Sequence, residues 1–136
     1  MGNKKILIVD DDPDVRLGVH VRLRANHYDT FFAVDAVEAI SAARKHEPDL
    51  IILDLGLPAG DGFLVMERLK TVPSLAVIPI IVVSARELHA NRMRTLRAGA
   101  HAFLQKPVDD AELLLVIRRA LGERSEREQL YSLSNP

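Results

Sequence analysis

The sequence predicts an α/β domain with a doubly wound, five-stranded parallel sheet and helices on both faces. Short, unbroken apolar runs alternate along the chain with longer segments of helical period. The runs at 6–9, 50–53 and 80–83 consist of Ile, Val and Leu, as expected for strands that are buried on both faces. The chain has 136 residues, 48% of them hydrophobic, which is enough for one such domain and too little for two.

The strands are expected in the order in which the apolar runs occur. Three strong strands are predicted at 6–9, 50–53 and 80–83, and two weaker ones at 29–33 and 102–105. Each is followed by a segment of helical character. Five strand–helix units in series favour a parallel sheet, because right-handed crossovers place the helices on its two faces.

Start and stop signals support the five predicted helices. Asp12 followed by Pro13 predicts the N-cap and the first residue of a helix that extends to about residue 26. A small-residue face follows Ala36 and ends before Pro48, and Gly99 is a typical residue after a helix end. The remaining four helices are expected at 36–43, from 61 to 69, from about 87 to 98 and from about 109 to 121.

Composition excludes several classes of function. The chain contains no cysteine, which excludes a disulfide framework, a thiol nucleophile and Cys-ligated zinc. The net charge of -1 gives no reason to expect binding to nucleic acid or to an anionic membrane. The apolar runs are too short to cross a bilayer, and no secretory signal is visible. We therefore expect a cytoplasmic protein without direct contact to nucleic acid or membrane.

Polar side chains end four of the five predicted strands. Ligand sites in open α/β sheets lie beyond the carboxyl ends of the strands, so these side chains are candidates for a common site. Capping of the following helix explains Asp12 but not Asp54, which precedes a turn. The residues in question are Asp10, Asp11 and Asp12 after the first strand, Asp54 after the third, Ser84 after the fourth and Lys106 after the fifth.

The chemistry of these side chains points to a metal ion and a phosphoryl group. If the first and third strands are neighbours, their carboxylates converge and must be either protonated or neutralised by a cation. An all-oxygen site favours Mg²⁺, with Mn²⁺ as the other candidate. Asp54 is ionised at neutral pH and can act as the nucleophile that forms an acyl phosphate. Lys106 and Ser84 can neutralise or hydrogen-bond the phosphoryl oxygens.

Five short motifs follow one another along the chain. They are Val9-Asp10-Asp11-Asp12, the stretch from Asp54 to Gly62, Val83-Ser84-Ala85, Gly99-Ala100 and the stretch from Phe103 to Pro107. In this order and at these spacings, they resemble the receiver domain of two-component response regulators. The resemblance covers about residues 4–121 and implies a flavodoxin-like strand order of 2-1-3-4-5 and a cis bond between Lys106 and Pro107. We expect a receiver domain over residues 1–122 and a polar tail or linker stump over 123–136.

The resemblance implies a role for individual residues at the metal site. Asp10 and Asp11 resemble the acidic pair that binds the metal ion, and Asp54 resembles the phosphoacceptor. Gly56 resembles the residue whose backbone carbonyl completes the protein ligands to magnesium. These four residues form the expected metal set.

The resemblance also implies a switch. Ser84 corresponds to the hydroxyl residue that moves toward the phosphoryl group, Lys106 to the family's lysine, and Phe103 to the aromatic residue whose rotamer follows phosphorylation. The expected output surface is the face made by the fourth helix, the fifth strand and the fifth helix, open to a homodimer or an output domain. The expected function is a phosphoacceptor that takes its phosphoryl group from a histidine kinase or histidine phosphotransfer protein and hydrolyses it slowly. It is a signalling domain and not a metabolic enzyme.

Two alternatives belong to other functional classes. Asp10-Asp11-Asp12 after a strand resembles the first motif of haloacid-dehalogenase-type phosphatases, with Asp10 as nucleophile and Asp12 as acid and base. That interpretation leaves Asp54 without a role and requires a cap domain for which the chain has no length. The second alternative is a receiver-like binding module that never accepts a phosphoryl group.

Overall fold

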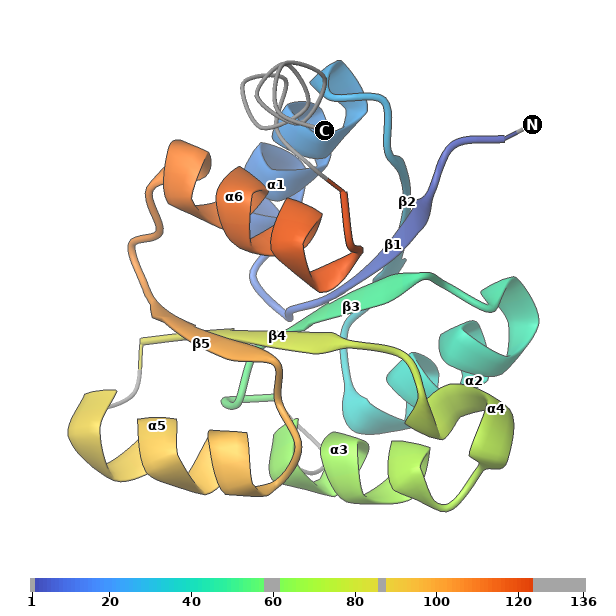
Figure 1. Ribbon diagram of the computed structural model, residues 1–136, viewed down its shortest axis with the longest axis vertical. Coiled ribbons are helices and arrows are strands. Elements are labelled where there is room, and N and C mark those ends of the chain that lie inside the picture. The colour runs from blue at the N-terminus through green and yellow to red at the C-terminus, as the bar shows by residue number, and fades with distance from the viewer. Residues whose placement is uncertain (1, 58–61, 86–87, 124–136) are drawn as a thin grey trace, which may run out of the picture.

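A parallel sheet of five strands forms the centre of the molecule (Figure 1). The computed structural model describes residues 2–57, 62–85 and 88–123. The strands run in the order β2-β1-β3-β4-β5 with every neighbouring pair parallel, which confirms the predicted order 2-1-3-4-5. Their bounds are β1 (Lys5–Val9), β2 (Asp29–Ala33), β3 (Leu50–Leu53), β4 (Ile80–Ser84) and β5 (Ala102–Gln105).

The described residues contain the five predicted helices and one that was not predicted. The additional helix, α4, is a single turn in which Pro73 is the first residue and Leu75 is buried. Four residues are too few to display a helical period, so the sequence pattern did not reveal it. Because of α4, the predicted fourth and fifth helices are α5 and α6. The bounds are α1 (Pro13–Ala25), α2 (Ala36–His46), α3 (Gly62–Lys70), α4 (Pro73–Ala76), α5 (Leu88–Arg97) and α6 (Asp110–Ala120).

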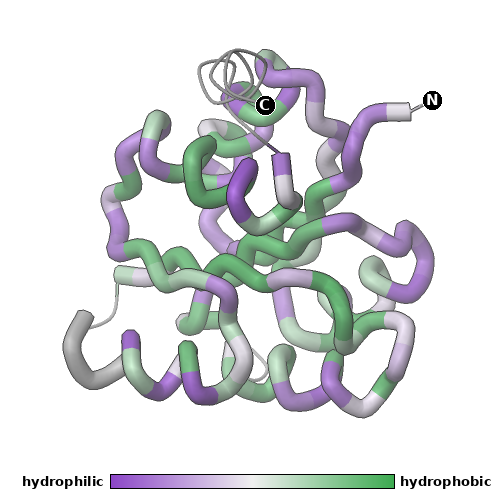
Figure 2. Tube along the Cα trace, viewed as in Figure 1, coloured by the Kyte–Doolittle hydropathy of each residue, from purple (hydrophilic) through white to green (hydrophobic). Residues whose placement is uncertain are grey.

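The helices form two layers, one on each face of the sheet. Helices α1 and α6 lie on one face, and α2, α3, α4 and α5 lie on the other (Figure 1). Successive residues of a strand point to opposite faces, so Ile6 and Ile8 of β1 pack toward α1 and α6, while Leu7 and Val9 pack toward α2 and α3. The hydropathy colouring shows the same division, with apolar residues gathered along the central strands (Figure 2).

The capping signal at the start of α1 is confirmed. The Asp12 carboxylate accepts hydrogen bonds from the backbone N–H groups of Asp14, at 2.9 Å, and Val15, at 3.4 Å. Pro13 is the first residue of the helix, where its missing N–H group costs nothing. The cap fixes the turn between β1 and α1, which carries the three consecutive aspartates.

The apolar run 113–117 on α6 mostly belongs to the core. Leu113 and Ile117 are buried, Leu114 and Val116 are half-buried, and only Leu115 in this run is exposed, at 37%. The run therefore leaves little apolar surface for a partner to cover. Among the described residues, no helix combines the length and apolar character that a membrane crossing requires.

Glu123, the last described residue, contacts the turn between α1 and β2. The hydroxyl group of Tyr28 donates to Glu123 Oε2 at 2.8 Å, and the backbone N–H of Glu123 donates to the carbonyl of Arg118 at 2.7 Å. Burial, the hydrogen bond to Glu123 and the charge of Glu123 raise the pKa of Tyr28 to about 12. Apart from Glu123, the predicted tail 123–136 lies outside the described residues.

The native chain should lose stability at alkaline pH because Tyr28 has a raised pKa, and we expect Tyr28→Phe to abolish that loss. The pKa of an unfolded tyrosine is about 10, so the folded state holds this proton more tightly, and the stability it confers is complete below about pH 10. That contribution disappears as the pH rises through the folded pKa of about 12. Urea unfolding at increasing pH should show the native chain losing about 2–3 kcal/mol relative to Tyr28→Phe. Identical pH dependence of the two proteins would contradict this assignment.

Candidate functional site

The predicted polar residues meet at the carboxyl edge of the sheet. Asp10 follows β1, Asp54 follows β3, Ser84 ends β4 and Lys106 follows β5. The backbone N–H of Asp54 donates to the carbonyl of Val9 at 2.9 Å, which ties the end of β3 to that of β1. Asp10, Asp54 and Ser84 are exposed by only 4%, 9% and 1%. Four strand ends therefore contribute to one largely buried polar site.

Lys106 lies between the two buried carboxylates. Its Nζ atom is 2.7 Å from Asp10 Oδ2 and 3.5 Å from Asp54 Oδ2. Burial on its own would lower the pKa of Lys106, but the hydrogen bond to Asp10 and the charges of Asp54 and Asp10 outweigh it, so this pKa lies above its ordinary value. The ammonium group therefore stays protonated throughout the neutral range. The bond between Lys106 and Pro107 is cis, as the resemblance implied.

The acidic residues are arranged so that they can hold a metal ion. Asp10, Asp11 and Asp54 each offer a carboxylate oxygen, and these three atoms all lie within 4.8 Å of one another. Oxygen donors alone, without nitrogen or sulfur, suit a hard divalent cation such as Mg²⁺. Asp11 is exposed, which leaves room for water molecules on that side of an ion. The donor set of the chain thus fits the predicted cation.

The turn after β3 holds the Asp54 side chain from its backbone. Gly56 N–H donates to Asp54 Oδ1 at 3.2 Å, and a Cβ atom at position 56 would lie 3.8 Å from both carboxylate oxygens. Position 56 therefore borders the Asp54 carboxylate. Because glycine has no side chain, the space on this side of the carboxylate stays open.

Gly62 allows α3 to begin against the turn that carries Asp54. A Cβ atom at position 62 would lie 2.7 Å from the carbonyl oxygen of Asp54 and 2.9 Å from the Cα atom of Leu55. Both neighbours are backbone atoms, which cannot rotate away as a flexible side chain can. The backbone N–H of Gly62 also donates to the carbonyl of Leu55 at 3.0 Å. The close approach thus requires glycine at this position.

The two predicted switch residues lie on neighbouring strands, Ser84 at the end of β4 and Phe103 within β5. The carbonyl of Ser84 accepts the backbone N–H of Lys106 at 2.9 Å, which joins the ends of β4 and β5. Phe103 pairs in register with Val82 and is only 6% exposed. Its ring belongs to the apolar cluster on the face covered by α2 and α3, so the aromatic residue is packed inside the domain.

Sequence reasoning did not find Arg16. This arginine lies in α1, and its NH1 group donates to the backbone carbonyl of Asp10 at 2.8 Å. Its spacing could have placed it near the site. Arg16 is one helical turn beyond the N-cap Asp12, and long helical side chains point back toward the N-terminus.

A groove of about 880 Å³ leads from the surface to the acidic site. It runs between α1 and the connection from β5 to α6, and Asp10, Asp54 and Lys106 line one part of it. Leu17 and Val21, one turn apart on α1, also line it and are 60% and 58% exposed. The groove therefore combines an apolar rim with access to the buried carboxylates.

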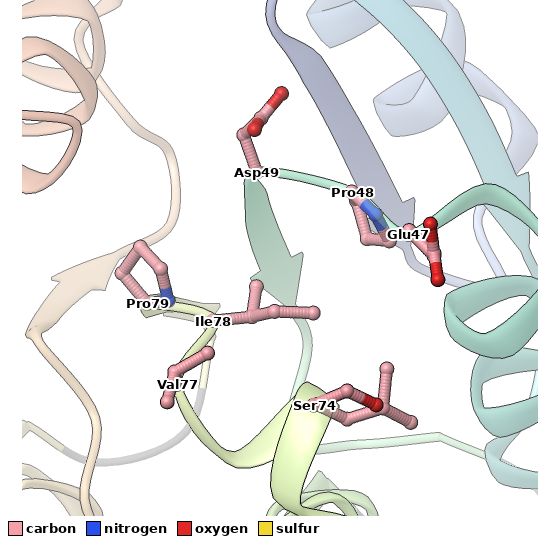
Figure 3. A pocket seen from close by; sticks show the side chains of 8 residues that line it. Glu47, Pro48, Asp49, Ser74, Val77, Ile78 and Pro79 are labelled. Carbon is pink, nitrogen blue, oxygen red and sulfur yellow. The ribbon is translucent and has the colours of Figure 1, made fainter.

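A second pocket, of about 250 Å³, lies at the opposite edge of the sheet (Figure 3). It lies between the segments that precede β3 and β4, and the Asp49 carboxylate on its border points away from Val77 and accepts the backbone N–H of Lys5 at 2.8 Å. None of the predicted site residues reaches it. Its lining residues are Glu47, Pro48, Asp49, Ser74, Leu75, Val77, Ile78 and Pro79.

The fold and the site define a class of protein: a doubly wound α/β domain with an acidic cluster and a lysine at the carboxyl edge of its sheet. Comparison of sequences gives the family. A family model described as the response regulator receiver domain matches residues 6–118. Response regulator PleD of Caulobacter vibrioides is 37% identical over 115 residues, which are 84% of this chain and 25% of PleD. The DNA-binding dual master transcriptional regulator RpaA of Synechocystis is 38% identical over 123 residues, 90% of this chain and 51% of RpaA.

Solved structures of receiver domains have a similar fold. The receiver domain of sensor histidine kinase PA1611 from Pseudomonas aeruginosa, with a magnesium ion coordinated in its active site cleft, has a TM-score of 0.82 and 29% identity, covering 90% of this chain and 100% of that one. A CheY-like response regulator receiver domain protein from Methanospirillum hungatei also has a TM-score of 0.82, with 28% identity and 89% and 95% coverage. The chain belongs to the response regulator receiver domain family of two-component systems. It spans a quarter to about half of the length of the two curated relatives.

Proposed function

We propose that this chain is a magnesium-dependent phosphoacceptor switch in which Asp54 accepts the phosphoryl group. The observation that carries the proposal is the juxtaposition of three carboxylate oxygens within 4.8 Å of one another and an ammonium group 3.5 Å from Asp54 Oδ2. A nucleophile, a set of oxygen donors for a cation and a fixed positive charge are the components that phosphoryl transfer needs. The magnesium ion in the receiver domain of PA1611 supports the choice of cation.

The proposed transfer begins with an oxygen atom of Asp54. This oxygen forms a bond to phosphorus while the bond from phosphorus to the imidazole nitrogen of the donor breaks, and that nitrogen keeps the electron pair and takes up a proton. Lys106 and the Ser84 hydroxyl then bind phosphoryl oxygens. A Mg²⁺ ion held by Asp10, Asp11, Asp54 and the carbonyl of Gly56 would neutralise negative charge that develops on these oxygens. Mn²⁺ has the same ligand preference.

The phosphorylated state ends by slow hydrolysis. Water attacks phosphorus, the bond to Asp54 breaks, and inorganic phosphate and a proton leave while the carboxylate is restored. The open approach at Gly56, where a Cβ atom would lie 3.8 Å from the carboxylate oxygens, gives water a path to the acyl phosphate. The chain thus catalyses its own phosphorylation and dephosphorylation but acts as a signalling domain.

The donor in this proposal is a histidine kinase or a histidine phosphotransfer protein. Its imidazole group has to reach Asp54, and the groove beside α1 provides a route that ends at this residue. The exposed Leu17 and Val21 on the rim of the groove can bury against an apolar surface of the donor.

The output in this proposal leaves through α5, β5 and α6. Phosphorylation draws Ser84 toward the phosphoryl group, and the packing of Phe103 then changes beneath this surface. The surface would meet a second copy of the chain or an output domain, without direct contact to nucleic acid or membrane. A cytoplasmic location agrees with the absence of cysteine. The receiver domain would occupy residues 1–122, with 123–136 as a tail or linker.

Incubation with Mg²⁺ and acetyl phosphate, followed by measurement of intact mass, tests this function. We expect one phosphoryl adduct that requires Mg²⁺, disappears when a chelator is present from the start, and decays slowly after the donor is removed. Binding of Mg²⁺ without an adduct would indicate a receiver-like binding module. Steady release of phosphate through an adduct on Asp10 would indicate the phosphatase, although both Asp10 oxygens are already engaged by Asp12 N–H and Lys106.

A further inference from the structure

Arg16 binds the backbone at the point where β1 ends. The N–H of Asp10 still donates to Ala33 in the neighbouring strand, at 3.1 Å, but β1 itself ends at Val9. The carbonyl of Asp10 therefore lies beyond the regular strand pairing, and the guanidinium group of Arg16 donates to it at 2.8 Å. A cationic donor forms a stronger hydrogen bond than a neutral one, so this contact fixes the orientation of the peptide unit between Asp10 and Asp11.

The next peptide unit is fixed as well. The N–H of Asp12 donates to Asp10 Oδ1 at 2.9 Å. Asp11 thus lies between two held peptide units, one through the carbonyl of Asp10 and one through the N–H of Asp12. Because the backbone on both sides of Asp11 is held, the direction of its Cα–Cβ bond is set even though its side chain is exposed.

We propose that Arg16 is a positioning residue that directs the Asp11 carboxylate toward the metal ion. The proposal rests on the proposed function, since it assigns Arg16 to the Mg²⁺ site formed by Asp10, Asp11 and Asp54. The contact that carries this role is the one from Arg16 to the backbone carbonyl of Asp10, not a contact with the ion or the phosphoryl group. Arg16 acts through the backbone of the turn that carries two of the three carboxylates.

The direction in which the affinity for Mg²⁺ changes when Arg16 is removed separates a positioning role from a purely electrostatic one. The guanidinium group is always protonated, so its charge close to an acidic cluster weakens the attraction of that cluster for a divalent cation. If charge were the whole effect of Arg16, its removal would tighten the binding of Mg²⁺. If Arg16 positions Asp11, its removal weakens that binding.

Isothermal titration of the intact chain with Mg²⁺, without a phosphodonor, tests the proposal. Arg16→Met keeps the length of the stem and removes the donors and the charge. We expect its dissociation constant for Mg²⁺ to rise by about 10-fold or more, as is typical when the partner of a metal ligand is lost. Arg24→Met is the matched control, because Arg24 lies on the same helix, is exposed and binds Asp29 at 3.0 Å, and we expect its dissociation constant to be unchanged.

Arg16→Lys keeps the positive charge and should fall between the native chain and Arg16→Met. Unchanged or tighter binding by folded Arg16→Met would overturn the proposal. If only Arg16→Lys folds, an affinity equal to that of the native chain would overturn it instead. A native chain that binds no Mg²⁺ would refute the proposed function and, with it, the assignment of Arg16 to a metal site, whereas native binding of Mg²⁺ that persists in Arg16→Met would refute the role of Arg16 alone.

Discussion

Asp54→Asn should yield no phosphoryl adduct with Mg²⁺ and acetyl phosphate. A carboxylate oxygen is the attacking atom in the proposed transfer, and the neutral amide of asparagine is not a nucleophile that forms an acyl phosphate. The side chain keeps its size, and its amide oxygen can still accept the N–H of Gly56, which bonds to Asp54 Oδ1 at 3.2 Å. Loss of the phosphoryl adduct would therefore reflect the missing nucleophile and not a disrupted turn. Intact mass of the native and substituted chains measures it.

Asp49→Asn is the matched control for this substitution. Asp49 precedes β3, as Asp54 follows it, and its carboxylate binds the backbone N–H of Lys5 at 2.8 Å. Asparagine can accept the same bond, so the variant should form the adduct at the native level. An adduct that persists in Asp54→Asn would show that another residue is the nucleophile, and its position by peptide mapping would identify that residue.

Lys106→Met is expected to slow phosphorylation by a factor of about 100 to 1,000, the usual cost of removing one charge-stabilising donor from a transition state. The Nζ atom lies 3.5 Å from Asp54 Oδ2, close enough to meet an oxygen of the incoming phosphoryl group. Mg²⁺ should bind as tightly as to the native chain or more tightly, because two buried carboxylates lose their positive neighbour. The rate follows from adduct formation over time, and the affinity from calorimetric titration.

In Lys106→Met the rate of phosphorylation should fall while the affinity for Mg²⁺ does not. Loss of both Mg²⁺ binding and phosphorylation would mean that Lys106 mainly holds the site together. Lys70→Met serves as the control, since Lys70 is an exposed lysine at the end of α3, beside Gly99. It should change neither quantity. Phosphorylation at the native rate in Lys106→Met would contradict the assigned role.

The sheet could be predicted because its signal is local and strong. Four consecutive apolar residues rich in Ile, Val and Leu at 6–9, 50–53 and 80–83 are typical of strands that are buried on both faces of a parallel sheet. The order of the strands could not be predicted in this way, because no feature within a strand specifies the strand with which it pairs. The order came from resemblance, and pairing of β1 with both β2 and β3 confirms it.

The convergence of the acidic residues could also be predicted, since the carboxyl ends of parallel strands share an edge. The contacts within the site could not. The 2.7 Å bond from Lys106 to Asp10, and the longer 3.5 Å distance to Asp54, depend on how a flexible side chain settles between two carboxylates. The bond from Arg16 to the Asp10 carbonyl likewise depends on the angle at which α1 leaves the turn.

The position of Lys106 among the carboxylates sets a charge balance for the site. Asp10, Asp11 and Asp54 with the ammonium of Lys106 leave two negative charges among these four side chains, the charge that one divalent cation cancels. Without a cation this edge of the sheet repels an anionic donor such as acetyl phosphate, and a monovalent ion would remove only half of the repulsion. Under the proposed function we therefore expect the cation to bind first and to ease the approach of an anionic phosphoryl donor to Asp54.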